Sequence, residues 1–569
     1  MNSPRQLVLL CDGTNNNLSG RHSDTHVVLL AELLRLYPDT ARLIYYDPGV
    51  GNPGQLPGTT FADKVRRVRE RIDGLAFGRG LFDNIAEGYR FLMAHWRPGD
   101  EIFIFGFSRG AFTARSIAGL VNAFGIIDSH QDTLVSSLVA TYFSRPSDQR
   151  KAITEQAARL FGQGGGGAWP KVHFVGVWDT VASVGLPPFG LKITAKPDLA
   201  GKHFRHVRHA MALDEQRAQF LPRAYEQDNG GYAMADGQSG DVVQCWFRGS
   251  HCDVGGGNHY PFSELSRAPF AWLVSEAIGC GLRLPPGEEP PLRGEADVLA
   301  IMPRLDPDPP TREEARINSE TCTTPLWALT GLKVRDTVHA LVDDATGGSA
   351  VKMAVHPSVG RWTQVFPQGT AWLHRGSAAA WLGLAAMLAL MAGLVWAMGW
   401  QLKPPAPQWP LLEQLAAARD AVVQFQAWQL GWGLGLAWAD VGRGFEHPMR
   451  ALLLDMPLIG AYVIVLAPWV CRAFARHAGL IRVGDAPPVW LNRAGWALPL
   501  AVGADVLEDL LTAWCLYALH SDGVVVPLLR WLMAAASGLK WLGLVGVAAL
   551  ILTSFAKHHR EAPGAVAAA

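Results

Sequence analysis

A run of 27 residues without a charged side chain, Gly376 to Leu402, is the feature that most limits what this chain can fold into. Arg375 and Lys403 bound the run. At 1.5 Å per residue, about 20 helical residues cross a hydrocarbon core of about 30 Å. Because a buried helix of a water-soluble domain rarely stays uncharged over this length, the run predicts a transmembrane helix.

The composition of the chain changes near this run. Of the 569 residues 50 are basic and 50 acidic, a balance that lacks the positive charge of a dedicated nucleic-acid-binding protein. Only 23 of these charged residues follow residue 376, whereas 14 of the 21 tryptophans follow residue 371. Trp gathers at lipid interfaces and charge is excluded from hydrocarbon. The composition therefore predicts a water-soluble N-terminal part (the front of the chain) joined to a C-terminal part (the back) that associates with a membrane.

The front of the chain contains short apolar runs that each end in a polar or glycine-rich turn. Helical spacing of apolar residues between 80 and 96 places a helix among these runs. Strands that alternate with helices predict an α/β fold with a mostly parallel sheet covered on both faces. Ligands bind beyond the carboxyl ends of such strands. The expected strands are QLVLLC (6–11), RLIYY (42–46), EIFIF (101–105), VHFVGVW (172–178) and DVVQCWF (241–247).

One of these turns has the pattern of a nucleophile elbow. Gly106-x-Ser108-x-Gly110 follows an expected strand and precedes a run of residues that favour a helix. The glycines permit a strained turn that holds the serine oxygen clear of the backbone, and they let the turn pack tightly. We therefore predict Ser108 as a catalytic nucleophile, with a plain strand-to-helix turn as the alternative.

A serine nucleophile needs a general base that a carboxylate orients. Enzymes with this elbow use the chain order Ser, then Asp or Glu, then His. Asp179, at the end of its strand, and His251, in the loop after a later strand, satisfy both order and placement. Asp179 could instead cap a helix, and Asp253 competes for the acid role, although its glycine neighbours suggest that it braces the loop.

Two loops are candidates for the oxyanion donors. The backbone N–H of Arg109, the residue after the nucleophile, is the first, since it opens a helix. The backbone of Gly13 and Thr14, after the first strand, is the second, with a simple Asx-turn as the alternative.

Metal and cofactor sites are not expected. The seven cysteines are scattered without a CxxC pair, and no lysine follows the glycine-rich run 162–167 as in a phosphate-binding loop. His203, His206 and His209 fall roughly along one helix face, yet Arg205 and Arg208 would repel a cation. Structural or surface histidines are the better interpretation.

Six motifs stand in order in the front of the chain: CDGTNNN (11–17), YYDPGVG (45–51), PGDEIFIFGFSRGAFTARSIAGLV (98–121), VWDTVASVG (177–185), HAMALDEQR (209–217) and GSHCDVGGG (249–257). Together they resemble a known family, the type VI secretion lipase effectors of the first class in bacteria. The resemblance spans roughly residues 5 to 280 and implies an α/β-hydrolase-like phospholipase domain. It implies Ser108 as nucleophile, Asp179 as acid and His251 as base, and hydrolysis of acyl esters of membrane phospholipids. The family contains toxins injected into rival bacteria.

Three further segments in the back of the chain are candidate spans, which gives up to four transmembrane segments. They are Ala451–Cys471, Trp496–His520 and Trp531–Phe555. The second carries three acids on one helix face, so that face must meet a cavity, other helices or water. Residues 411–438 suit an interfacial helix. We expect a hydrolase-like domain at 1–290, a connecting or accessory region at 291–376 and a helical membrane region at 377–569.

The arginines between these spans bear on sidedness. With four spans, residues 1–375, the loop 472–495 and the tail 556–569 share one side, and the loop alone carries four arginines. The positive-inside rule then places the catalytic domain on the cytoplasmic side of the membrane.

Together these features predict a membrane-anchored serine lipolytic hydrolase of the phospholipase A type that acts on lipid esters at the bilayer surface. The resemblance adds delivery into a target cell, with a secretion-apparatus component or an immunity protein as partner. A membrane-anchored esterase for another substrate and a catalytically inactive membrane interaction protein are the alternatives.

Overall fold

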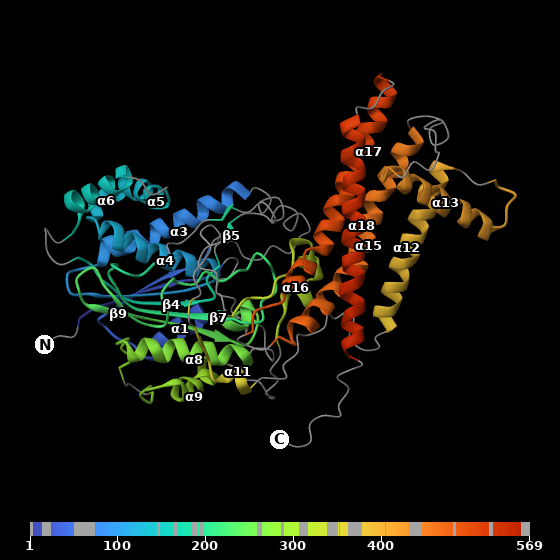
Figure 1. The fold of residues 1–569 in the computed structure, drawn as a ribbon. Helices are drawn as coiled ribbons and strands as arrows, with labels where there is room; N and C mark the ends of the chain where they lie inside the picture. The colour runs from blue at the N-terminus through green and yellow to red at the C-terminus, as the bar shows by residue number, and fades with distance from the viewer. Residues whose placement is uncertain are drawn as a thin grey trace, which may run out of the picture.

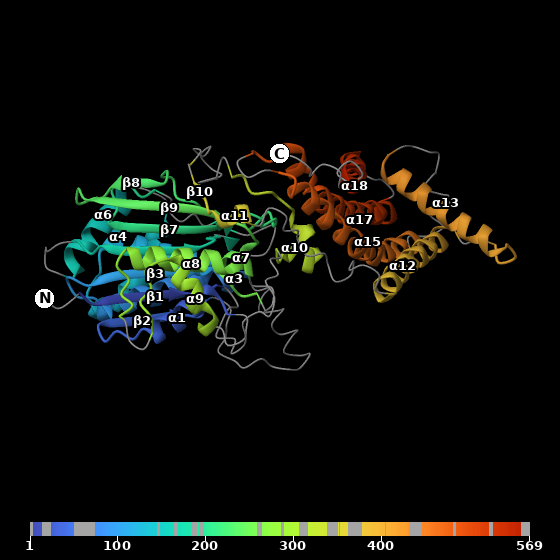
Figure 2. The ribbon, with the colours of Figure 1, turned by 90° about the horizontal axis from the view of Figure 1, so that it is seen from below.

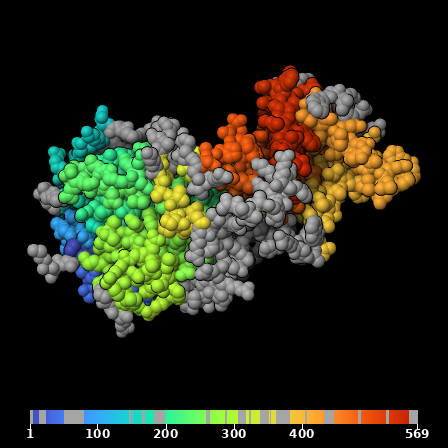
Figure 3. All heavy atoms as spheres, turned by 60° about the horizontal axis from the view of Figure 1, so that its bottom comes forward, coloured from blue at the N-terminus to red at the C-terminus, as the bar shows by residue number. Residues whose placement is uncertain are grey.

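The computed structural model of the chain contains an α/β part and a helical part that lie side by side (Figure 1). The space-filling view shows them as two masses, with the helices after residue 378 extending away from the sheet (Figure 3). The structure describes residues 4–13, 24–49, 74–144, 148–163, 169–181, 183–184, 191–192, 198–258, 264–285, 289–305, 317–337, 351, 353–361, 378–403, 406–431, 446–481, 485–522 and 527–558.

An eight-stranded sheet forms the centre of the α/β part. Its order is β10-β9-β7-β4-β3-β1-β2, and β8 pairs with β9 at the same end. Every pair is parallel except β8 with β9. Figure 2 shows β8, β9, β7, β3, β1 and β2 one below another in this order. The strands are β1 (Gln6–Cys11), β2 (Arg42–Asp47), β3 (Glu101–Phe107), β4 (Val172–Trp178), β7 (Phe204–Ala212), β8 (Gly230–Ala233), β9 (Ser239–Phe247) and β10 (Ala354–Val355).

Helices cover both faces of this sheet, as the alternating pattern predicted. Leu7 and Leu9 of β1 point into one apolar core and Val8 and Leu10 into the other, because successive side chains of a strand face opposite ways. The first face carries α3 (Gly74–His95), α4 (Ser108–Phe124), α5 (Val135–Phe143) and α6 (Asp148–Phe161), and the second α1 (His26–Leu36), α8 (Glu264–Gly279) and α9 (Glu295–Leu305).

The region predicted as a connection, 291–376, is in part a component of the α/β fold. Val298, Ile301 and Leu305 of α9 are buried in the same core as α1 and α8. β10 adds a parallel strand beside β9. Part of the predicted connecting or accessory region thus packs as a component of the α/β part. The sequence concealed this because α9 is short and carries acids in its first turn. Two further short elements, α10 (Glu320–Thr323) and the 3-10 helix η2 (Pro325–Thr330), contact the helical part.

The helical part, which we call the membrane module, follows residue 378. Three of its helices are long and apolar enough to cross a membrane, by length and composition: Leu382–Leu402, Glu446–Ala478 and Pro527–Phe555. The module consists of α12 (Ala378–Leu402), α13 (Leu411–Gln429), α15 (Glu446–Ala478), α16 (Val489–Ala494), α17 (Ala497–Asp522) and α18 (Pro527–His558).

The fourth expected span, α17, is not among these three helices, because Asp505, Glu508 and Asp509 interrupt its apolar sequence. α17 nevertheless lies alongside α18 (Figure 1). All three acids are buried, and Lys540 of α18 lies 2.7 Å from Asp505 and 3.0 Å from Glu508. The acidic face thus meets other helices, one of the environments expected for it.

Candidate active site

Ser108 lies at the junction of β3 and α4, with its backbone at φ 58°. Such an angle is strained for a residue other than glycine and persists only where the surroundings enforce it. The neighbouring glycines allow the surrounding backbone to pack closely enough to hold Ser108 at this angle. A Cβ on Gly106 would lie 2.5 Å from the Gly110 carbonyl oxygen, and one on Gly110 would lie 2.2 Å from the Cys11 carbonyl oxygen. The turn at Ser108 is therefore packed tightly between the first turn of α4 and the end of β1.

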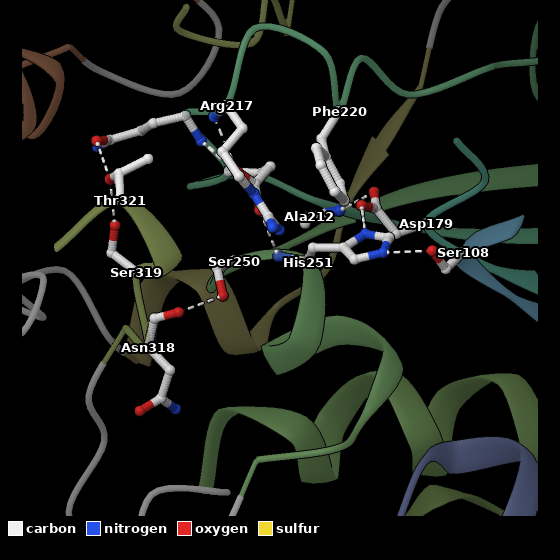
Figure 4. A network of polar contacts seen from close by, with 12 residues as sticks. Ser108, Asp179, Ala212, Arg217, Phe220, Ser250, His251, Asn318, Ser319 and Thr321 are labelled. Carbon is white, nitrogen blue, oxygen red and sulfur yellow. Dashed lines mark hydrogen bonds and ion pairs between the residues drawn. The ribbon is translucent and has the colours of Figure 1, made fainter. Parts of the chain in front are cut away.

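His251 and Asp179 complete a chain of contacts with this serine. Ser108 Oγ lies 2.7 Å from His251 Nε2, and His251 Nδ1 lies 2.6 Å from Asp179 Oδ2. Figure 4 shows the His251 imidazole between the Ser108 hydroxyl and the Asp179 carboxylate. They come from three strand ends at one edge of the sheet: Ser108 follows β3, Asp179 follows β4, and His251 begins α7 (His251–Gly255) after β9. The parallel sheet thus brings together residues up to 143 positions apart.

Asp179 is fully buried and has three further donors. The Arg335 guanidinium binds both carboxylate oxygens, with Nη1 2.6 Å from Oδ1 and Nη2 2.9 Å from Oδ2. The Ala212 N–H donates to Oδ1 at 2.9 Å. Burial alone would raise the pKa of Asp179, but the charges of Arg335 and His251 outweigh it and hold that pKa well below its usual range. Asp179 therefore stays ionised at neutral pH.

Aromatic rings and a buried ion pair hold His251 in place. The Phe107 and Phe220 rings lie 4.7 and 5.1 Å from the imidazole, centroid to centroid. The His251 backbone N–H donates to Glu215 Oε2 at 3.2 Å. Glu215 in turn binds Arg217 through both carboxylate oxygens, at 2.9 and 2.8 Å. The imidazole is only 5% exposed, so its position between Ser108 and Asp179 is tightly defined.

Asp253, the alternative acid, lies in a different set of bonds. Its Oδ2 accepts the Ser250 N–H at 2.8 Å, which with the Ser250 side chain forms a capping box at the start of α7. Asn318 donates its backbone N–H to Oδ2 and its side-chain amide to Oδ1. These contacts brace the loop that carries His251, while Asp179 is the carboxylate on the imidazole.

The two oxyanion candidates differ. The Arg109 N–H lies in the first turn of α4, where backbone N–H groups lack intrahelical acceptors. The Gly13 N–H, by contrast, donates to Asp12 Oδ1 at 2.6 Å, and Asp12 is fixed by Thr25 and Tyr46. In this structure the Gly13 N–H thus has the Asp12 carboxylate as its acceptor, and its role as an oxyanion donor stays a prediction. Thr14 lies outside the described residues.

The three histidines weighed as a metal site lie on or beside a strand, not a helix. His206 and His209 belong to β7, where a spacing of three puts them on opposite faces. His206 binds Asp241, and His209 Nε2 accepts the Thr180 N–H at 3.2 Å. His203 stacks on Trp169. Among the described residues, the grouping with metal-ligand geometry is Asp455, Asp505 and Asp509 in the membrane module.

Two parts of the site were missed in the sequence. Glu215 and Arg217 stand in the motif HAMALDEQR. An acidic and a basic residue two positions apart in that motif could have indicated the ion pair. Arg335 gave no such indication. It lies 156 residues after Asp179, in a region without periodic pattern.

The fold and this arrangement of strand-end residues define an α/β-hydrolase-like protein. Residues 5–276 match the family model described as T6SS, phospholipase effector Tle1-like, catalytic domain. This part of the chain is therefore similar to the catalytic domain of type VI secretion phospholipase effectors, in agreement with the resemblance of its six motifs.

Two other similarities are weaker. An uncharacterized protein of Saccharomyces cerevisiae is 31% identical over 235 residues, which cover 38% of this chain and 32% of that protein. The chain thus spans about a third of the length of this curated relative. The crystal structure of an uncharacterized protein from Pseudomonas aeruginosa is 16% identical, with a TM-score of 0.31, and covers 88% of this chain and 67% of that one.

Proposed function

We propose that this chain is a serine lipolytic hydrolase of the phospholipase A type, with Ser108 as nucleophile, His251 as general base and Asp179 as orienting acid. The observation that carries the proposal is the unbroken series of contacts from Ser108 Oγ through the imidazole to a buried, ionised carboxylate. The similarity of residues 5–276 to a phospholipase effector domain supports a phospholipid ester as the substrate class.

The contacts support a two-step acyl transfer. With the Nδ1–H donated to Asp179, His251 Nε2 is free to accept the Ser108 hydroxyl proton as Oγ attacks the ester carbonyl. The Arg109 N–H is the proposed donor to the oxyanion. His251 returns the proton to the leaving lysolipid oxygen, and an acyl-serine remains. Water, deprotonated by the same imidazole, then releases the fatty acid and restores Ser108.

The membrane module gives this chemistry its location. All but five of the exposed large hydrophobic side chains among the described residues lie after residue 381. An apolar surface of this extent favours lipid contact. We infer that α12, α15 and α18 cross a bilayer, and that α17 crosses with them because its acids are sheltered against Lys540. The anchor would concentrate the enzyme at an insoluble substrate.

The delivery route and sidedness are part of the same proposal. The family consists of secretion effectors, which supports transfer of this chain into a target cell and an immunity protein as a partner. If all four helices cross, residues before α12 and after α18 share one side, and the arginines of 472–495 favour the cytoplasmic side.

Lipid release by the purified full-length protein tests the proposal. Wild type, Ser108→Ala and Ser116→Ala are incubated with phosphatidylethanolamine–phosphatidylglycerol liposomes, and fatty acid and lysolipid are measured. Ser116 is the matched control, because its hydroxyl lies in the same helix but donates to the Phe112 carbonyl oxygen. We expect Ser108→Ala alone to lose both products. Equal release by wild type and Ser108→Ala would refute the serine mechanism.

A second substrate separates the alternatives. A soluble short-chain ester hydrolysed while liposomes stay intact would favour an anchored esterase with another substrate. No Ser108-dependent turnover of either substrate would favour an inactive interaction protein.

A further inference from the structure

Arg335 is a buried cation that binds the carboxylate proposed as the catalytic acid. Its side chain is 1% exposed. Besides Asp179, it donates to two backbone carbonyl oxygens, from Nη1 to Ala212 at 2.6 Å and from Nη2 to Phe220 at 2.5 Å. Four fixed acceptors hold the guanidinium plane, and a bidentate pair fixes the carboxylate plane in turn.

The orientation of that carboxylate matters for His251. Asp179 Oδ1 receives Arg335 Nη1–H and the Ala212 N–H, while Oδ2 receives Arg335 Nη2–H and faces His251 Nδ1. Without Arg335 the carboxylate would keep one backbone donor and lose its fixed plane. A buried charge without its partner is strongly destabilised. The pKa of the Asp179 carboxyl group would therefore rise, and the group would be protonated more readily.

The backbone before Arg335 is bound to both halves of the molecule. On the side of the α/β part, the Ala218 N–H donates to the Gly331 carbonyl oxygen at 3.1 Å, and the Lys333 N–H donates to the Gln216 carbonyl oxygen at 2.8 Å. We call residues 331–335 the coupling segment.

On the other side, the coupling segment is bound to the corner between α16 and α17 of the membrane module. The Leu332 N–H donates to the Gly495 carbonyl oxygen at 3.0 Å, and the Val334 N–H donates to Asn492 Oδ1 at 2.9 Å. Donors at 332 and 334 thus face the module, whereas the bonds at 331 and 333 face the α/β part.

Side-chain packing reinforces this second attachment. Leu332 is fully buried in a core formed mainly by the membrane module. Gly331 has φ 87°, and a Cβ there would lie 2.8 Å from the Trp496 ring. A displacement of the corner between α16 and α17 would therefore move the backbone three residues from Arg335. The other members of this core include Ala328, Phe474, Leu491, Ala497 and Leu498.

We propose that Arg335 is a positioning residue for the catalytic acid, and that the coupling segment makes the geometry of the active site depend on how the membrane module is seated. The inference rests on the proposed Ser108–His251–Asp179 mechanism. It extends that mechanism, because Arg335 lies beyond the matched catalytic domain, residues 5–276. Hydrolysis is thereby linked to the state of the membrane-facing helices.

The first test replaces Arg335 in the full-length protein and measures turnover of a soluble ester in detergent. We expect Arg335→Ala to lower kcat about 100-fold with little change in KM, since misplacing a catalytic group by about 1 Å has such an effect. Arg335→Lys should keep part of the activity. Guanidinium ion at non-denaturing concentration should restore part of the loss in Arg335→Ala, which it cannot do for a protein that has failed to fold.

The pH profile is the readout that a purely structural role would leave unchanged. Three charged or titratable groups interact electrostatically with the Asp179 carboxylate: Arg335, His251 and His209. Removal of Arg335 should shift the acidic limb of the kcat profile to higher pH, because burial then raises the pKa of Asp179. Wild-type kcat in Arg335→Ala, or a loss with no rescue and an unshifted profile, would overturn the role of Arg335.

The second test disturbs the module side without touching the triad. A Cβ on Gly495 would lie 1.9 Å from the Leu332 carbonyl oxygen, whereas a Cβ on Gly503 of α17 meets nothing within 4 Å. Gly495 has ordinary helical backbone angles, so Gly495→Ala adds only the collision. We expect Gly495→Ala to lower kcat on the order of tenfold and Gly503→Ala to leave it unchanged.

Asn492 offers a gentler version of the same test. Asn492→Asp keeps an acceptor for the Val334 N–H, and Asn492→Leu does not. Equal kcat in wild type, Gly495→Ala and Asn492→Leu would overturn the coupling. If Ser108→Ala itself retained activity, the proposed function would fail. If Ser108 were required but these variants were fully active, only the coupling would fail.

Discussion

The α/β part and the membrane module bury charge in opposite ways. At the active site, each of two buried acids has a cation of its own, Asp179 with Arg335 and Glu215 with Arg217. In the module, Asp455, Asp505, Glu508 and Asp509 are all buried, and the cation bound to two of them is Lys540.

The outer surfaces differ in the complementary sense. Exposed side chains such as Leu382, Trp531 and Leu542, at 69%, 75% and 63%, are apolar in the module. A protein that faces lipid has to place its polar groups inside, whereas the active site buries charge in order to fix a geometry. The predictions below test this difference, beginning with the largest expected effect.

Loss of the orienting acid should have the largest effect. Asp179→Asn removes the charge that fixes the His251 tautomer and stabilises the imidazolium, so turnover should fall about 10⁴-fold, or about 5.5 kcal/mol in transition-state free energy. Asp253→Asn, on the loop beside it, should reduce turnover by less than about tenfold. The measurement is kcat on a soluble ester. A larger loss in Asp253→Asn would reverse the two assignments.

Removing the cation of the module should come next. Lys540→Met leaves Asp505 and Glu508 without the ammonium group and should destabilise the module by about 3–5 kcal/mol. Thermal unfolding in detergent checks this. The double variant Lys540→Met with Glu508→Gln should recover part of the loss. An unchanged unfolding midpoint in Lys540→Met would show that the acids need no cation.

The pH dependence of stability contrasts two acids within the α/β part. Asp12 is held by Thr25, Tyr46 and the Gly13 N–H, all neutral donors, and burial raises its pKa to about 6. Because the folded-state pKa exceeds the unfolded value, its stabilising contribution is full below about pH 3.8 and is lost as pH rises through about 6.

Asp12→Asn should therefore remove about 2 kcal/mol of the gain in stability that wild type shows between about pH 7 and pH 4. Asp179 has the opposite sign, since its contribution is present above about pH 3.8 and is lost only as pH falls through its much lower folded-state pKa. Unfolding midpoints at a series of pH values test this. Parallel curves for wild type and Asp12→Asn would contradict it.

The smallest effect concerns the exposed apolar surface of the membrane module, which we propose faces lipid. Leu542→Gln exchanges an exposed apolar side chain of α18 for a polar one and should weaken liposome binding by about 1–2 kcal/mol, roughly tenfold. Leu160→Gln makes the same change on α6 of the α/β part, where Leu160 is 57% exposed. Liposome flotation should show no effect there. Equal weakening of liposome binding by both variants would contradict lipid contact through the membrane module alone.

The sequence predicted the parts of the site that follow from local pattern. The elbow at Ser108 has a glycine signature, and Asp179 and His251 each follow a recognisable strand, so a parallel sheet brings them to one edge. The histidines near 206 misled because a spacing of three fits a helix face, whereas the segment is a central strand.

What could not be predicted depends on tertiary contact alone. Arg335 reaches Asp179 across 156 residues from a segment with no period, and a lone arginine carries no signal of its partner. α17 was recognised as an unusual span because its acids share a face, but the cation facing them, Lys540, lies on another helix. Pairs of buried charges far apart in sequence are what one sequence does not reveal.

Covalent labelling of the full-length protein tests the central claim most directly. The protein is treated in detergent with a fluorophosphonate, a reagent that bonds to activated serines, and the modified residue is located by mass spectrometry. We predict a single adduct on Ser108, absent in His251→Ala and strongly slowed in Asp179→Asn and Arg335→Ala. Labelling of Ser108 at the wild-type rate in His251→Ala, or no adduct on Ser108 in a protein that hydrolyses lipid, would contradict the account.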